Sequence, residues 1–295
     1  VDHISVGSNV YSTDWDVIAR YLKSKSHHMV AGDFEGFDAS EQSDILYAAG
    51  EVLQELSKKI FNSTEDEILQ QKAIIHSLVN SLHINENGIV LQWCKSLPSG
   101  HYLTAIINSV FVNLVMCLVF MEANQKYSFM TASSFFRECG IVAYGDDHVV
   151  SVPEKYLSVF NQQTLPVLMS KFGMFYTIET KDDTEIDFLS RKLEDVSYLK
   201  RNFVYDEPRQ RYIAPLSLDV ILEMPMWTKS SRDVVTNVFC NLEHALKELS
   251  LHDKDLWDKW SPILHSKSEE VLKMVSSLKI QDEVREIALG LLGYE

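Results

Sequence analysis

The sequence has few of the residues that mark disordered, secreted or metal-stapled proteins. Only 11 Gly and 7 Pro occur in 295 residues, and 46% of the residues are hydrophobic, which is typical of a folded globular chain. The chain has four widely spaced cysteines with no Cys-x-x-Cys pair, so neither a zinc site nor a dense disulfide framework is expected. The N-terminus lacks a starting Met and a signal-peptide pattern, so we expect this stretch to be the middle of a longer protein.

The chain also lacks a long unbroken hydrophobic run. The longest apolar run covers residues 104–121. It contains Asn108, Ser109 and Asn113, whose polar side chains would each need a partner inside hydrocarbon. We therefore expect a buried helix here and no transmembrane segment.

Positive charge is scarce. Forty-two acidic residues against 27 basic residues give a formal charge of −15, whereas a self-sufficient nucleic-acid binder is usually basic. Six basic residues lie in one stretch: Arg191, Lys192, Lys200, Arg201, Arg209 and Arg211. Four acidic residues in the same stretch dilute this positive charge. The charge leaves open a non-catalytic acidic domain that binds cations or a partner protein.

Two strand-like segments end in aspartates. Residues 29–34 read as an apolar strand that contains Asp33, and a helix with apolar positions from Ile45 to Ile60 follows. The β-rich runs 141–144 and 148–152 flank Gly145-Asp146-Asp147, as in a hairpin. Elsewhere the pattern predicts a turn at 85–88 between two strands, a loop at 98–100 before a helix from Thr104, a helix near 154–172, strands through Ile213, and helices from Ser231 with breaks near Asp253 and Pro262.

Three carboxylates at neighbouring strand ends would favour a metal site. Asp33, Asp146 and Asp147 would repel one another without cations, and two divalent ions about 3.5–4 Å apart need hard carboxylate ligands for phosphoryl transfer. By itself, however, Gly-Asp-Asp is also an ordinary hairpin turn.

The tripeptide does not stand alone, because short motifs in order and spacing resemble the palm of picornavirus-like RNA-dependent RNA polymerases. They are Asp33-Phe34-Glu35-Gly36-Phe37-Asp38, then Pro98-Ser99-Gly100 with Thr104 and Asn108, then Tyr144-Gly145-Asp146-Asp147. The likeness continues through Lys181, Phe188-Leu189-Ser190-Arg191, which is similar to a primer-gripping turn, and Trp227-Thr228-Lys229. The resemblance spans about Val6 to Lys229, and the general character of the sequence suggests the dicistroviruses.

The resemblance implies an α+β fold: a right-hand polymerase palm, with an antiparallel sheet backed by helices, and then a mostly helical thumb. We expect residues 1–187 to form the palm with residual fingers elements, with the catalytic core at about 25–155. Residues 188–295 would form the primer-gripping turn and thumb. The fingers would be largely absent, because they belong to a missing N-terminal region of the same polyprotein.

The resemblance also implies catalytic and metal-binding roles. Asp33 and Asp146, assisted by Asp147, would bind two Mg²⁺ ions, for which Mn²⁺ can substitute, and one ion would acidify the primer 3′-hydroxyl. Lys181 would protonate the leaving pyrophosphate, although a lone lysine is often only solvated.

Further residues would bind nucleotide or RNA. Asp38, Thr104 and Asn108 would form a ribose pocket, and Ser99 and Gly100 a mobile loop beside it. The RNA primer and template would contact Tyr144 and Arg191. The structural alternatives are an N-cap with a capping box to Glu41 for Asp38, a core hydrogen bond for Thr104 and Asn108, a plain turn for Ser99-Gly100, and a salt bridge for Arg191.

The sequence departs from the family at His101, where relatives usually have Cys, and at Ser190, which replaces a basic residue. The expected reaction is template-directed addition of ribonucleoside triphosphates to an RNA 3′ end during viral genome replication and transcription, in replication complexes in the host-cell cytoplasm. A reverse transcriptase shares the two-aspartate hairpin, but Asp38 with Asn108 favours ribose over deoxyribose. The acidic cation-binding or partner-binding domain remains the alternative outside enzymes.

Overall fold

The computed structural model describes residues 3–123, 129–179, 187–228 and 233–277. The chain divides into two compact units. Unit 1 comprises Val1–Leu199 and Tyr205–Tyr212, and unit 2 comprises Lys200–Val204 and Ile213–Glu295. Each unit is described by itself.

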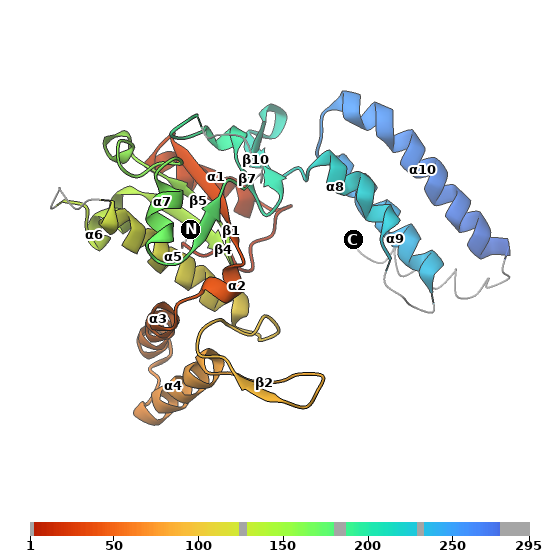
Figure 1. Ribbon diagram of the computed structural model, residues 1–295. Helices are drawn as coiled ribbons and strands as arrows, with labels where there is room; N and C mark the ends of the chain where they lie inside the picture. Colours follow the sequence, from red (N-terminus) through yellow and green to blue (C-terminus); the bar gives the residue numbers. More distant parts are fainter. Residues whose placement is uncertain (1–2, 124–128, 180–186, 229–232, 278–295) are drawn as a thin grey trace. The chain divides into compact units, whose positions relative to one another are not determined.

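Unit 1 is built on a four-stranded antiparallel sheet (Figure 1). Its strand order is β4 (Gly140–Tyr144), β5 (Asp147–Ser151), β1 (Met29–Glu35) and β6 (Phe175–Thr177). β1, β4 and β5 are buried along almost their whole length, which explains why their sequences are continuous apolar runs rather than alternating ones. The predicted first strand and the Gly-Asp-Asp hairpin are confirmed.

Helices cover the sheet. The α1 helix (Asp14–Lys25) contacts β4 and β5. The α5 helix (Thr104–Glu122) contacts β4 and is backed by α3 (Ser43–Phe61) and α7 (Leu165–Ser170). Alternate strand residues such as Ile141 and Ala143 belong to the core that contains α5, as the period of two along a strand requires.

α5 is long and apolar enough to cross a membrane by length and composition alone, and it is the one such helix among the described residues. In unit 1 it is a core helix, because 67% of that apolar stretch is buried. Phe111 and Phe120 are both fully buried on it. The expected buried helix is therefore present.

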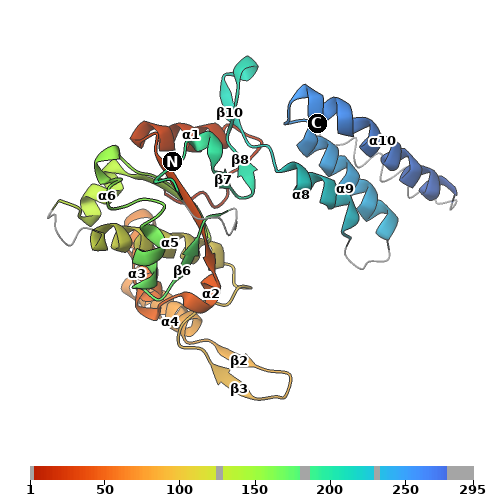
Figure 2. The ribbon, with the colours of Figure 1, turned by 45° about the horizontal axis from the view of Figure 1, so that its top comes forward.

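Residues 43–93 form two helices and a hairpin that are not part of the four-stranded sheet. After α3 come α4 (Glu65–Val79) and the hairpin β2 (Leu82–Ile84) and β3 (Val90–Gln92), which Figure 2 shows extending away from the helices. The side chain of Asn85 accepts hydrogen bonds from the amides of Asn87 and Ile89, which closes the predicted turn.

Two helix predictions were wrong. Residues 154–172 do not form one helix but a 3₁₀ turn, η1 (Glu154–Tyr156), and the short α7. Between them the Asn161 side chain accepts hydrogen bonds from the amides of Gln163 and Thr164, an alternative to helical pairing that asparagine readily supplies. Pro262 does not break a helix either, because it lies inside α10 (Lys254–Ser277).

Unit 2 contains the C-terminal helices. α8 (Leu218–Glu223) and η4 (Met224–Met226) precede α9 (Val234–Leu249), which packs on α10. The break near Asp253 is confirmed, and Leu242, Leu246 and Leu249 belong to the core of this unit with Leu264.

The short elements not yet given lie mostly in unit 1. They are α2 (Phe37–Ser40), α6 (Ala132–Glu138), η2 (Leu193–Asp195), β7 (Ser197–Tyr198), β8 (Arg201–Asn202), β9 (Val204–Asp206), η3 (Glu207–Arg209) and β10 (Arg211–Ile213).

The mixture of helices and antiparallel sheet is the expected fold class. From residue 188 onward the first described α-helix begins at Leu218, so residues 188–217 contain strands and 3₁₀ turns rather than the first helices of a thumb. The division into palm, thumb and absent fingers stays a prediction.

Candidate active site

The register of the sheet sets Asp33 beside the tip of the β4–β5 hairpin. The last residue pair between β1 and β5 is Gly32 with His148, so Asp33 and Asp147 are the next positions along two strands about 4.8 Å apart. Tyr144 pairs with Asp147 across the hairpin, and Gly145 turns the chain with φ 62°, a value that favours glycine. This geometry leaves Asp146 at the tip.

A buried histidine on β5 contacts the backbone of the hairpin tip. The Nδ1 atom of His148 lies 2.7 Å from the carbonyl oxygen of Asp146, and its Nε2 atom lies 2.9 Å from the hydroxyl of Tyr176. Burial lowers the pKa of His148 despite the nearby carboxylates of Asp146 and Asp33, so the ring is neutral near pH 7. A neutral ring with Nδ1–H donates to Asp146 and accepts from Tyr176, which fixes the backbone of Asp146.

Glycine at position 32 makes room for this support. A Cβ atom there would lie 2.3 Å from Cζ of Tyr176 and 2.5 Å from the carbonyl oxygen of Thr177. Tyr176 can therefore cross β1 only where the strand has no side chain. Neither His148 nor Tyr176 was expected from the sequence, although a histidine inside an apolar strand directly after Gly-Asp-Asp was a visible signal.

The α5 helix holds the other side of the tip. The amide of Gly145 donates to Oγ of Ser109 at 2.8 Å, and Ser109 donates to the carbonyl oxygen of Ala105 at 2.6 Å. Ser109 directly follows Asn108, so one helical turn both anchors the hairpin and carries a predicted ribose-binding residue.

The predicted ribose-pocket residues occupy different settings. Asp38 is exposed within α2, whereas Thr104 is half-buried and donates from Oγ1 to the carbonyl oxygen of Pro98 at 2.8 Å. The N-cap alternative for Asp38 is wrong: Gly36 stands at the N-cap of α2 and Gln42 at that of α3, and neither helix has a side-chain cap. The helix begins inside the motif because Gly36, at φ 59°, reverses the chain.

Glu41 is a site residue that was expected from the sequence only as a capping partner. Its side chain is fully buried, and its Oε2 accepts the amide of Leu97 at 2.9 Å. The Asn108 amide is oriented by two acceptors, so its nitrogen donates to Oε1 of Glu41 at 3.0 Å and to the carbonyl oxygen of Thr104 at 3.2 Å. Burial raises the pKa of Glu41 to about 8, and the charges of Asp38 and Asp146 act in the same direction.

The remaining predicted residues differ in accessibility. Ser99, Gly100 and Tyr144 are exposed. Arg191 is not a free cation, because its guanidinium lies 2.6 Å from a carboxylate oxygen of Glu179 and both side chains are largely buried. The structure thus shows the ion-pair alternative for Arg191, and Lys181 lies outside the described residues.

The carboxylates suit a hard divalent cation in their chemistry. Within the described ranges, no group of three or more His, Cys, Asp or Glu side chains is close enough to hold a metal ion by itself. Mg²⁺ is usually bound by one or two carboxylates together with substrate phosphates and water, rather than by an all-protein cage. Asp33 and the hairpin aspartates fit that mode of binding.

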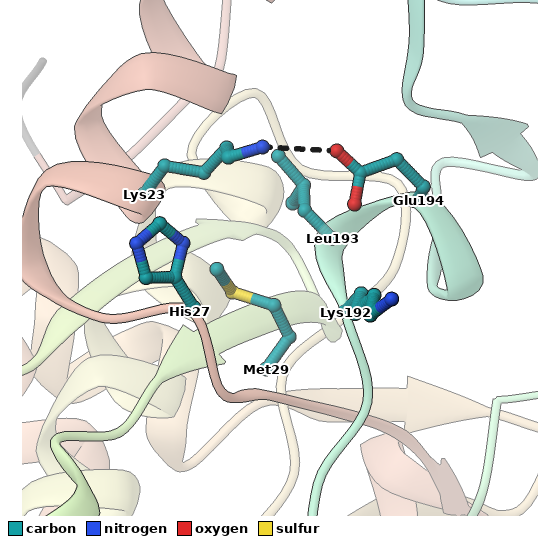
Figure 3. Close-up of a pocket in the computed structure, with 6 residues that line it drawn as sticks. All are labelled: Lys23, His27, Met29, Lys192, Leu193 and Glu194. Atoms are coloured by element: carbon teal, nitrogen blue, oxygen red, sulfur yellow. Dashed lines mark hydrogen bonds and ion pairs between the residues drawn. The ribbon is translucent and has the colours of Figure 1, made fainter.

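A separate cavity of about 190 Å³ lies away from these carboxylates (Figure 3). Lys23 spans part of it, with Nζ 3.0 Å from Oε1 of Glu194. Met29 lines it at the start of β1, about 13 Å along the strand from Asp33. The cavity is therefore not part of the candidate active site.

Comparison with known proteins decides the family. A family model described as viral RNA-dependent RNA polymerase matches residues 2–287. The chain belongs to the viral RNA-dependent RNA polymerase family. The resemblance found in the sequence motifs is confirmed.

The chain is similar to parts of replicase polyproteins from insect viruses. It is 33% identical over 269 residues to that of acute bee paralysis virus (strain Rothamsted), covering 89% of this chain and 14% of the polyprotein. It is 35% identical over 267 residues to that of Drosophila C virus (strain EB), covering 88% of this chain and 15% of the polyprotein. These dicistrovirus relatives confirm the predicted group, and the chain spans about one seventh of their length.

Proposed function

We propose that this chain carries the catalytic centre of an RNA-directed RNA polymerase, which adds ribonucleotides to an RNA 3′ end on an RNA template. The observation that supports this most is the strand register that sets Asp33 beside the Asp146-Asp147 tip in a chain of this family. Family membership does not favour a reverse transcriptase or a non-catalytic acidic domain.

In this proposal Asp33 and Asp146 hold two divalent ions, with Asp147 assisting. Bound ions would supply a more acidic primer 3′-hydroxyl and charge stabilisation on the triphosphate. The chain's own contribution is positioning: His148 fixes the backbone of Asp146, and Ser109 fixes Gly145. Mg²⁺ is the proposed ion and Mn²⁺ its substitute.

The remaining roles concern substrates. Asp38, Thr104 and Asn108 would bind the ribose, with Ser99 and Gly100 in the loop beside it, and Lys181 would protonate the pyrophosphate. Tyr144 is exposed at the end of β4 and would contact RNA. Arg191 is proposed to act on the primer only if its pair with Glu179 opens. The reaction would serve viral RNA replication in the host-cell cytoplasm.

The segment of residues 43–93 has exposed apolar side chains that support a further proposal, that a fingers region of the same polyprotein is a partner of this chain. Among its apolar side chains, Ile84 and Val90 are cross-strand partners on the β2–β3 hairpin and are 74% and 59% exposed. Contiguous exposed apolar surface marks an interaction site. We propose that the fingers region covers these side chains.

The catalytic assignment is tested by Asp146→Asn in a polymerase protein that contains this sequence. We expect nucleotide addition with Mg²⁺ to fall by several orders of magnitude while RNA binding stays nearly unchanged, because the amide loses a charged metal ligand. The exposed Asp66 on α4 provides a matched control, and Asp66→Asn should leave the rate near that of the wild type. A near-normal kcat for Asp146→Asn would overturn the assignment.

A further inference from the structure

Glu41 is a fully buried carboxyl group in contact with Asn108, a predicted ribose-binding residue. It ends the short α2 helix and has no exposed surface. Glutamate is almost never fully buried unless its oxygens have partners, because desolvation of the group costs free energy. Its partners therefore indicate what it does.

These partners come from two segments far away in the sequence. Oε2 accepts the amide of Leu97, and Oε1 accepts from the side-chain nitrogen of Asn108. Leu97 is itself only 1% exposed and immediately precedes the loop of half-buried Pro98 and exposed Ser99 and Gly100. One carboxyl group thus joins the base of this loop to the α5 helix.

The same contact determines which atom of the Asn108 amide remains for a substrate. One amide hydrogen goes to Glu41 and the other to the carbonyl oxygen of Thr104, which lies 3.2 Å away. The polar atom left is Oδ1, which can only accept a hydrogen bond. A ribose 2′-hydroxyl can donate one, and a deoxyribose lacks that donor.

We infer that Glu41 is a positioning residue that sets ribose selection by orienting the Asn108 amide and holding the base of the Ser99-Gly100 loop. The inference rests on the proposed polymerase function. Glu41 reaches the nucleotide through Asn108 and the loop, and does not touch the reacting atoms. In the proposed ribose pocket, Glu41 fixes the orientation of the buried Asn108 amide.

Glutamine at position 41 cannot replace both contacts. If its oxygen faces the amide of Leu97, its nitrogen meets the nitrogen of Asn108, and the Asn108 amide must turn over or lose a hydrogen bond. If its oxygen faces Asn108, the buried amide of Leu97 has no acceptor. Glu41→Gln is nearly the same size, so it tests the hydrogen-bond pattern rather than the packing.

The experiment compares the kcat/KM values for a ribonucleoside triphosphate and its 2′-deoxy analogue in a polymerase protein that contains this sequence. Glu41→Gln should lower the ratio of the two values about tenfold or more, mainly through the ribonucleotide. Glu41→Asp, which keeps the carboxyl group but shortens the reach, should act in the same direction. The matched control is the exposed Glu51 on α3, and Glu51→Gln should leave the ratio unchanged.

A double-mutant cycle separates positioning from a general structural effect. In an Asn108→Ala background, Glu41→Gln should change the ratio little further, because its route to the sugar is already removed. An unchanged ratio in Glu41→Gln and Glu41→Asp, or an equal drop with and without Asn108, would overturn the inference. If the wild-type protein adds neither nucleotide, the polymerase proposal itself has failed.

Discussion

Among single residues, Asn108 has the contacts that bear most directly on substrate choice. It is 6% exposed, lies on α5 directly before Ser109, and contacts Glu41 and Thr104 through its nitrogen. The core hydrogen bond considered for it from the sequence is therefore present. A ribose role does not compete with that bond, because the bond fixes the amide and leaves its oxygen as an acceptor.

Asn108→Ala should narrow the preference for ribonucleotides over deoxyribonucleotides. Loss of a hydrogen bond to the 2′-hydroxyl removes about 1–3 kcal/mol, or about one to two orders of magnitude, from ribonucleotide efficiency. Deoxyribonucleotide efficiency should change much less. The measurement is kcat/KM for both nucleotides on one primer and template, and an unchanged ratio would leave Asn108 with its structural role alone.

At the scale of elements, the site depends on the position of β1 between β5 and β6. β1 pairs with β5 up to Gly32 and then with β6 from Asp33 onward. Tyr176 on β6 reaches His148 on β5 across the strand between them, at the one position without a side chain. The backbone of Asp146 is therefore held by His148, which Tyr176 contacts across β1.

Gly32→Ala should destabilise unit 1. The new methyl group would lie 2.5 Å from the carbonyl oxygen of Thr177, a backbone atom that cannot move away as a flexible side chain can. We expect a loss of about 1–3 kcal/mol in the free energy of unfolding, measured by urea denaturation.

Gly100 provides the comparison for this substitution, because a Cβ atom there has open space around it. Gly100→Ala should change the free energy of unfolding much less. Equal stability of the two variants would show that Tyr176 and β6 adapt without cost.

At the scale of the whole molecule, charge limits what the chain can do alone. The formal charge is −15, and the basic stretch expected to offset it is partly neutralised. Arg191 pairs with Glu179, Arg201 with Glu248, and Arg209 with Asp206. Arg191 and Arg201, each 12% exposed in its pair, are therefore poor candidates for free phosphate contacts, whereas Arg209 is 68% exposed in a weak surface pair.

The 295-residue chain by itself should be inactive as a polymerase. Its net negative charge repels RNA at long range, and two bound metal ions would offset that charge only locally. The test is primer extension by the purified chain beside a polymerase protein that also contains the proposed fingers region, at low salt with Mg²⁺ or Mn²⁺. Comparable extension rates would show that the basic residues of this chain suffice.

The sequence by itself determined the features that depend on neighbouring residues. Short apolar runs predicted β1 and the β4–β5 hairpin, helical spacing predicted α3, and the long apolar run predicted α5. The ordered motifs indicated the polymerase family. Local patterns failed where side chains compete with helical hydrogen bonding, as at Asn161, or where a helix tolerates a proline, as at Pro262.

Only the tertiary structure decided the partners of the buried polar groups. Glu41 meets Leu97 across 56 residues, and His148 meets Tyr176 across 28 residues. Arg191 reaches Glu179 instead of solvent. These pairings follow from strand register and from the packing of α5 near the hairpin tip, and a buried polar group bonds whichever partner that packing brings within reach.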